Sequence, residues 1–61
     1  MRSITRHEME KRLNQSRVIN STMEQDTREI RIVLELESRE SCMVRYDLEN
    51  RTKDYLVAEN L

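Results

Sequence analysis

The 61-residue chain is short, highly charged and close to neutral. Charged residues make up 38% of it, the net charge is −1, and it contains no glycine and no proline. Without glycine it cannot form a glycine-rich phosphate loop, which excludes dinucleotide-binding and P-loop chemistry of the usual kinds. About 60 residues bury only ~60% of the surface that their unfolded chain exposes, so we expect a single, marginally stable domain over residues 1–61.

The first predicted element is a helix whose start is marked by two independent patterns. Thr5 and Glu8 have the spacing of a capping box, with Thr5 as the N-cap. Ile4 and Met9 occupy the two positions where apolar side chains form a hydrophobic staple across a helix start. These patterns together predict a helix that begins at about Arg6.

The end of this helix and the segment after it are less well defined. Val18 would point away from the apolar face of a continuing helix, so we expect the helix to end at residue 14 or 16. Ser21 and Glu24 form a second, weaker capping-box pattern, which allows a helical turn. The sequence therefore does not decide whether residues 17–26 form a strand, a helix or a loop.

Three segments after residue 27 are predicted strands: residues 28–37, 41–49 and 54–59. The first two alternate apolar and polar residues with period 2 over their whole length, which indicates strands with one buried face. Their apolar positions are Ile30, Ile32, Leu34 and Leu36, followed by Cys42, Val44, Tyr46 and Leu48. We expect the helix to cover this face of the sheet.

Matching the apolar faces predicts a pairing register for both hairpins, because a slip of one residue would move a whole apolar set to the other face. In the first hairpin the predicted partners are Leu36 with Cys42, Leu34 with Val44, Ile32 with Tyr46, Ile30 with Leu48 and Arg31 with Asp47, around an odd-length loop centred on Arg39. In the second, a two-residue turn at Asn50 and Arg51 sets Tyr46 against Tyr55, Val44 against Val57 and Asp47 against Asp54.

The predicted fold is α+β: an N-terminal helix followed by a three-stranded antiparallel β-meander that forms a dimer. The second face of the sheet should be polar, yet it carries apolar residues around one arginine, a composition typical of an interface core. These residues are predicted to form a partner or dimer interface: Val33, Met43, Arg45, Leu56 and Ala58.

The sequence points to no catalytic, cofactor or metal site. His7 and Glu8 begin a zinc-protease pattern, but Lys11 stands where the second histidine is needed. A single cysteine, Cys42, excludes a disulfide within the chain and is typical of a reducing compartment. With no signal-peptide pattern and no apolar run long enough to span a bilayer, we expect a cytoplasmic protein with no membrane contact and no small-molecule substrate.

The predicted function is that of a small regulatory protein that binds other proteins, of the inhibitor, antitoxin, antirepressor or adaptor type, and works as a homodimer. The alternative is a nucleic-acid-binding regulator, because residues 1–20 contain five basic and two acidic residues. In that alternative the N-terminal helix would contact phosphates through Arg2, Arg6, Lys11, Arg12 and Arg17.

Overall fold

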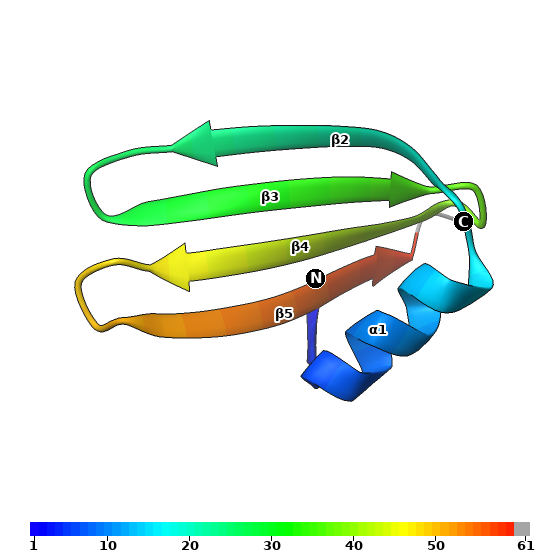
Figure 1. The fold of residues 1–61 in the computed structure, drawn as a ribbon, viewed down its shortest axis with the longest axis horizontal. Coiled ribbons are helices and arrows are strands. Elements are labelled where there is room, and N and C mark those ends of the chain that lie inside the picture. Colours follow the sequence, from blue (N-terminus) through cyan, green and yellow to red (C-terminus); the bar gives the residue numbers. More distant parts are fainter. Residues whose placement is uncertain (60–61) are drawn as a thin grey trace.

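The computed structural model describes residues 1–59 as one twisted antiparallel sheet with a single helix packed under one end (Figure 1). Its elements are β1 (Arg2–Ile4), α1 (Arg6–Gln15), β2 (Val18–Gln25), β3 (Glu29–Leu36), β4 (Glu40–Asp47) and β5 (Thr52–Glu59). The strand order is β1-β5-β4-β3-β2, so β2 to β5 form a meander and β1 pairs with β5. The α+β class is confirmed, but the prediction of three strands is wrong because the sheet has five.

The helix start agrees with both sequence patterns. The Oγ1 atom of Thr5 accepts a hydrogen bond from the backbone N–H of Glu8 at 3.1 Å. Ile4 and Met9 lie in one buried core cluster, as a hydrophobic staple requires. The helix ends where the backbone N–H of Ser16 bonds to the carbonyl oxygen four residues earlier. The predicted helix is therefore confirmed.

Residues 17–26, left open by the sequence, contain a strand rather than a helical turn. β2 pairs with β3 along its length, with a bulge between Val18 and Asn20. The turn that joins the two strands is closed by Asp26, whose Oδ1 atom accepts from the backbone N–H groups of Arg28 at 2.7 Å and Glu29 at 2.8 Å. An aspartate in this role replaces the glycine that a tight turn would otherwise use.

The first predicted hairpin exists, but its register is wrong by two residues. Leu34 lies opposite Cys42 and Ile32 lies opposite Val44, so the same side chains share a face with different partners. The connecting loop spans residues 37–39, with Arg39 at a φ of 73°. A three-residue loop that ends in a left-handed residue is a favoured hairpin geometry, whereas the predicted register needs five residues.

The second hairpin is also shifted by two residues from its prediction. Its loop has four residues, 48–51, so Leu48 is in the turn rather than in a strand, and Arg51 has a φ of 55°. The carboxylate of Asp47 holds this turn, because it accepts from the backbone N–H groups of Glu49 and Asn50, each at 3.0 Å. The observed partners are Tyr46 with Lys53, Val44 with Tyr55, Cys42 with Val57 and Asp47 with Thr52.

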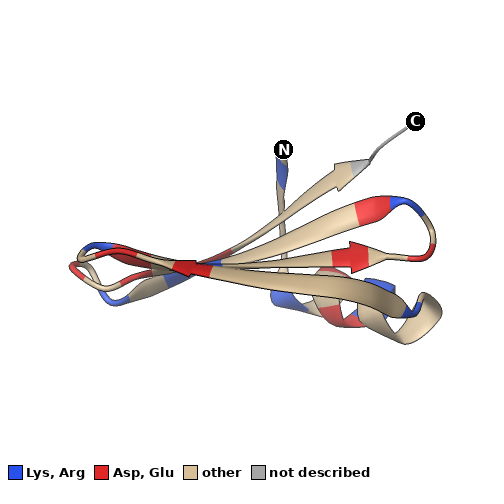
Figure 2. Cartoon of the chain, turned by 90° about the horizontal axis from the view of Figure 1, so that it is seen from above, with Lys and Arg blue, Asp and Glu red and all other residues tan. Residues whose placement is uncertain are grey.

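The core is at one end of the sheet, because the helix is shorter than the strands. A ten-residue helix spans about 15 Å and an eight-residue strand about 26 Å. Figure 2 shows α1 under one end of the sheet, while the strands continue past it to the hairpin turns. The buried residues all lie near the helix: Ile4, Met9, Leu36, Cys42 and Val57. The prediction that α1 covers the whole apolar face is therefore wrong at its far end.

The first testable prediction concerns the stability of this small core. Met9 is 2% exposed and is the helix residue at the centre of the cluster. Met9→Ala should lower the free energy of unfolding by about 2–5 kcal/mol, which is most of the ~3–9 kcal/mol expected for a chain of this size. Met9→Leu nearly conserves the volume and should cost less than about 1.5 kcal/mol. Urea denaturation monitored by circular dichroism measures both, and equal losses would contradict the packing described here.

The second prediction is a loss of stability in acid. Backbone hydrogen bonds, from Arg28 to Asp26 and from Asn50 to Asp47, lower the pKa of each carboxyl below its ordinary value of 3.8. A pKa that is lower in the folded state means that the stabilisation is complete above about pH 4 and is lost as the pH falls through the folded pKa. The melting temperature should therefore fall from pH 5 to pH 2.

A double variant, Asp26→Asn and Asp47→Asn, isolates the two turns. It should melt below the parent chain at pH 7, and the gap should close towards pH 2, where the parent aspartates are protonated. Glu49→Gln is the control, because it removes a neighbouring carboxylate without changing the hydrogen bonds of Asp47. If the double variant keeps the full acid dependence of the parent, other groups are responsible.

Candidate protein-binding surfaces

The residues predicted to form an interface lie together on the face of the sheet opposite α1. Val33, Met43 and Leu56 are direct neighbours on β3, β4 and β5. Ala58 lies on the same face, two residues after Leu56 in β5 and opposite Ser41 of β4. We call the predicted set (Val33, Met43, Arg45, Leu56, Ala58) the helix-free patch; its side chains are all half-buried. The structure thus brings the five residues onto one face, and their role as an interface stays a prediction.

Ion pairs lie next to the apolar row of this patch. Arg45 donates from Nη2 to Oδ2 of Asp54 at 2.9 Å, and this hydrogen bond raises the arginine's pKa. Arg31 pairs with Glu29 and Glu24, so the predicted contact of Arg31 with Asp47 is wrong. In the observed register Arg31 lies opposite Arg45. Glu29 and Glu24 neutralise Arg31, and Asp54 neutralises Arg45. An apolar row beside paired charges has the layout of an interface core with a polar rim.

A second apolar surface lies on the helix side, beyond the end of α1. Its residues, Ile30, Ile32, Val44 and Tyr46, are half-buried, and Val44 also packs against the core cluster; we call them the open strip. Lys53 covers part of it, with its Nζ atom 5.4 Å from the centroid of the Tyr46 ring. This surface was not predicted from the sequence, although the different lengths of a ten-residue helix and an eight-residue strand imply it.

The outer edge of β2 is the third exposed feature. All eight β2 residues are exposed, with Ile19 at 61% and Met23 at 67%. Only Glu24 carries a charge in this strand, whereas β3, β4 and β5 carry three charged residues each. β2 lacks the apolar–polar alternation of a half-buried strand, which is why the sequence did not reveal it.

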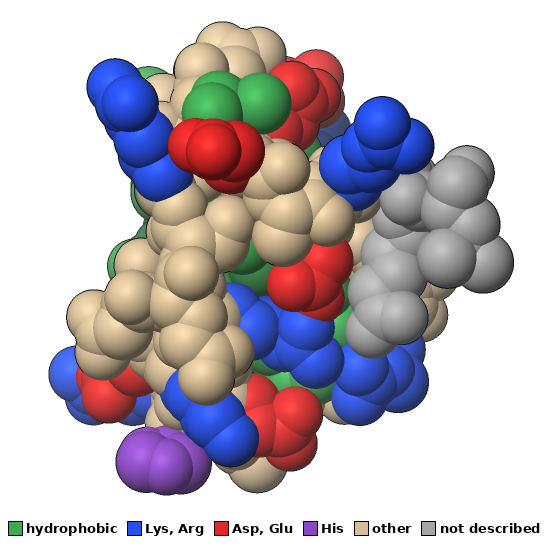
Figure 3. Space-filling model, turned by 90° about the vertical axis from the view of Figure 1, so that its right-hand side faces the viewer, with side chains coloured by type: hydrophobic (Ala, Val, Ile, Leu, Met, Phe, Trp, Pro, Cys, Tyr) green, Lys and Arg blue, Asp and Glu red, His purple; other side chains and the backbone are tan. Residues whose placement is uncertain are grey.

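The basic residues proposed for nucleic-acid binding do not form a surface of one sign. Arg6 pairs with Glu10 at 3.1 Å, and Arg12 pairs with Glu40 across the helix–sheet contact. Lys11 and Arg17 are exposed, and Arg2 lies in β1 at the other edge of the sheet. Figure 3 shows acidic side chains interspersed among the basic ones on the end of the molecule that carries the helix. This mixture weakens the electrostatic case for phosphate binding.

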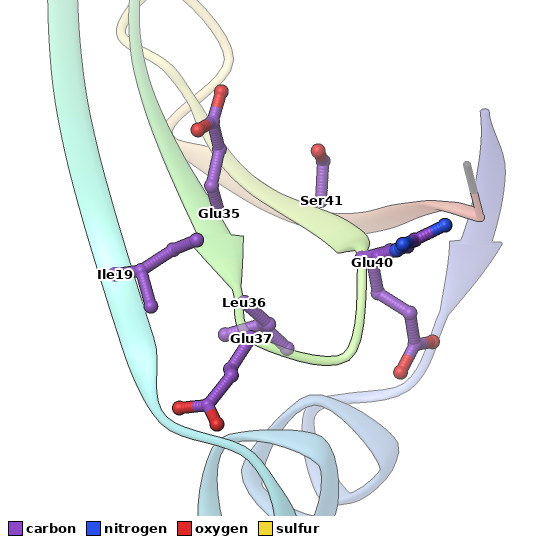
Figure 4. Close-up of a pocket in the computed structure, with 7 residues that line it drawn as sticks. Ile19, Glu35, Leu36, Glu37, Glu40 and Ser41 are labelled. Atoms are coloured by element: carbon purple, nitrogen blue, oxygen red, sulfur yellow. The ribbon is translucent and has the colours of Figure 1, made fainter. Parts of the chain in front are cut away.

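A hollow of about 520 Å³ beside the loop between β3 and β4 is lined by Ile19, Glu35, Leu36, Glu37, Arg39, Glu40 and Ser41. Its acidic side chains do not converge: Figure 4 shows the carboxylates of Glu35, Glu37 and Glu40 pointing in different directions. Within residues 1–59, no group of three histidine, cysteine, aspartate or glutamate side chains is placed to hold a metal ion. The acidic side chains of the hollow are therefore not arranged as a metal site.

Comparison with known proteins gives no family for this chain. No protein-family model, curated protein or solved structure matches it. Over residues 1–59, no helix combines the length and the apolar character needed to cross a membrane. The function must therefore be inferred from the three surfaces.

The third prediction tests the inert character of Cys42. The residue is 0% exposed, and burial raises the pKa of its thiol, so the reactive thiolate is disfavoured at neutral pH. The native protein should react with a chromogenic disulfide reagent at least about tenfold more slowly than the protein in 8 M urea. Similar rates in both conditions would show that the core around Cys42 opens readily.

Proposed function

We propose that this chain is a small, non-enzymatic regulatory protein of the cytoplasm that acts by binding another protein and works as a homodimer. The observation that carries the proposal is that the sheet has apolar residues on both faces, while the single helix packs under one end of one face. Two layers of packing are normally needed to bury a sheet with two apolar faces. A partner protein supplies the missing layer.

The helix-free patch is the surface we propose for this partner. Val33, Met43 and Leu56 form a continuous row across three strands, and no element of residues 1–59 covers that face. The charges beside the row are already paired within the chain, as in Arg45 with Asp54, so a partner would not leave an unpaired arginine there. An inhibitor, antitoxin, antirepressor or adaptor would use such a surface.

Nucleic-acid binding is the less favoured function. Two of its five proposed contacts, Arg6 and Arg12, already pair with carboxylates of the same chain. Both tyrosines lie on the helix side of the sheet, where Lys53 sits over their rings, so they offer little surface for stacking on bases. Binding through the remaining basic residues would be weak and strongly dependent on salt.

The fourth prediction separates the two functions. The tagged chain should capture a stoichiometric protein from its native lysate, and the capture should survive nuclease treatment and 0.5 M NaCl. Met43→Lys places a charge at the centre of the helix-free patch, and Ala58→Lys places one at its end. Met43→Lys should weaken the capture at least about tenfold, as expected when a central interface residue is lost, and Ala58→Lys should weaken it less.

The control for these variants is Gln15→Lys, which adds the same charge at the exposed end of α1. It should capture the partner as well as the parent chain does. Circular dichroism would establish that all three variants are folded. Capture that is abolished by nuclease would favour the nucleic-acid alternative, and capture unchanged by both patch variants would rule out the helix-free patch.

A further inference from the structure

We propose that a second copy of this chain pairs antiparallel with the outer edge of β2, so that two five-stranded sheets join into one sheet of ten strands. The two Met23 residues then face each other at the two-fold axis. The inference deepens the homodimer part of the proposed function, and rests on it, by naming the surface that the second copy uses. It shares no residue with the helix-free patch.

The two edges of the sheet differ in a way that singles out β2. An open strand edge invites pairing with another chain, and proteins usually protect it by making it short or by adding charge. The β1 edge is three residues long and includes Arg2. The β2 edge is eight residues long, contains no basic residue and has Glu24 as its single charge. The β2 edge is thus the one that lacks these protections.

The backbone groups that face outward from β2 can be identified. The N–H of Asp26 donates to the carbonyl of Glu29 at 3.0 Å, so residues 26 and 29 form a hydrogen-bonded pair between β2 and β3. Hydrogen-bonded and non-hydrogen-bonded pairs alternate along an antiparallel ladder. Ser21, Met23 and Gln25 therefore direct their N–H and C=O groups away from β3, towards a strand that would pair with the edge.

The sequence of β2 is compatible with its own copy in antiparallel pairing. A two-fold axis at Met23 sets Ser21 opposite Gln25 of the second copy, and Thr22 opposite its Glu24. No like charges meet in this register. An axis at Glu24 would place the two carboxylates face to face, which is destabilising.

The register centred on Met23 also joins the apolar surfaces of the two copies. Within one chain, Met23 lies beside Ile32, and Ile32 lies beside Val44, on the helix side of the sheet. Pairing Met23 with its copy extends this row across the axis, so that Met23, 67% exposed in the single chain, gains an apolar neighbour. The exposed methionine is thereby explained as the centre of an interface.

The position of the helix leaves this edge accessible. Figure 1 shows α1 at the side of β5, while β2 runs along the opposite edge of the sheet. Because the two-fold axis is perpendicular to the sheet, both helices lie on one face and both helix-free patches on the other. The dimer would therefore present two copies of the patch to a partner on one continuous surface.

The fifth prediction is tested by the mass of the protein in solution. Light scattering at 5–500 µM should give the mass of a dimer for the parent chain and for Gln15→Lys. Met23→Lys should give a monomer, because it places two ammonium groups opposite each other at the axis. Met23 is exposed, so this variant should keep the circular dichroism spectrum of a folded chain.

A cross-linking experiment tests the register. In the register centred on Met23 the two residues at position 23 lie directly opposite each other, with Cα atoms about 5.5 Å apart, whereas the two at position 22 are diagonal neighbours and lie farther apart. Under mild oxidation Met23→Cys should form a covalent dimer, Thr22→Cys should form much less, and the parent chain with its buried Cys42 should form none. Faster cross-linking of Thr22→Cys would overturn the register centred on Met23.

The mass measurement also separates the two proposals. A monomeric mass at every concentration would overturn both the edge pairing and the homodimer, and would leave binding through the helix-free patch intact. A dimer that is unaffected by Met23→Lys would overturn the edge pairing alone.

Discussion

The contact of a ten-residue helix with eight-residue strands is the constraint on which the rest of this structure depends. The helix covers about 15 Å of strands that run for about 26 Å, so it can bury side chains at one end only. Met9 reaches Leu36, Cys42 and Val57 there, and these residues form almost the entire core. The apolar residues at the other end, such as Ile30, have the right pattern for a core but no layer above them. The open strip on the helix side follows from this mismatch.

The end of the sheet without a core is held by polar interactions instead. The carboxylates of Asp26 and Asp47 fix the two turns there, and the backbone N–H of Leu48 donates to the carbonyl of Arg28 at 2.8 Å, which ties one turn to the other. With no glycine in the chain, Arg51 occupies the left-handed region at this end, at a cost of roughly 1–2 kcal/mol. Hydrogen bonds to carboxylates therefore stabilise this end of the sheet, as apolar packing stabilises the end next to the helix.

The sequence could predict which face of the sheet each side chain occupies, but not which residues lie opposite each other on neighbouring strands. Val33 and Met43 were assigned correctly to one face, because a shift of two residues leaves every side chain on its face. The predicted partner of Arg31 was wrong because the same two-residue shift puts Arg45 in the place of Asp47. The turns decide the register. The residue that indicates the position of the second turn is Asp47, whose carboxylate caps it, rather than the Asn50–Arg51 pair. β2 was missed because an edge strand with no buried face leaves no periodic pattern.

The stability of β2 links the proposed pairing at its outer edge to the proposed partner-binding face of the sheet. Ordering its backbone costs about 1–2 kcal/mol per residue, and the strand buries none of its own side chains in return. Each ladder hydrogen bond to β3 contributes only about 0.5–1.5 kcal/mol net, so one ladder offsets part of this cost. In the dimer that we infer, a second ladder forms on the outer edge and the two Met23 side chains contact each other. Pairing then stabilises β2 by mass action, which couples the order of this strand to protein concentration. Because β2 supports β3, and β3 carries Val33, assembly at the edge would also stabilise the face that we propose binds the partner.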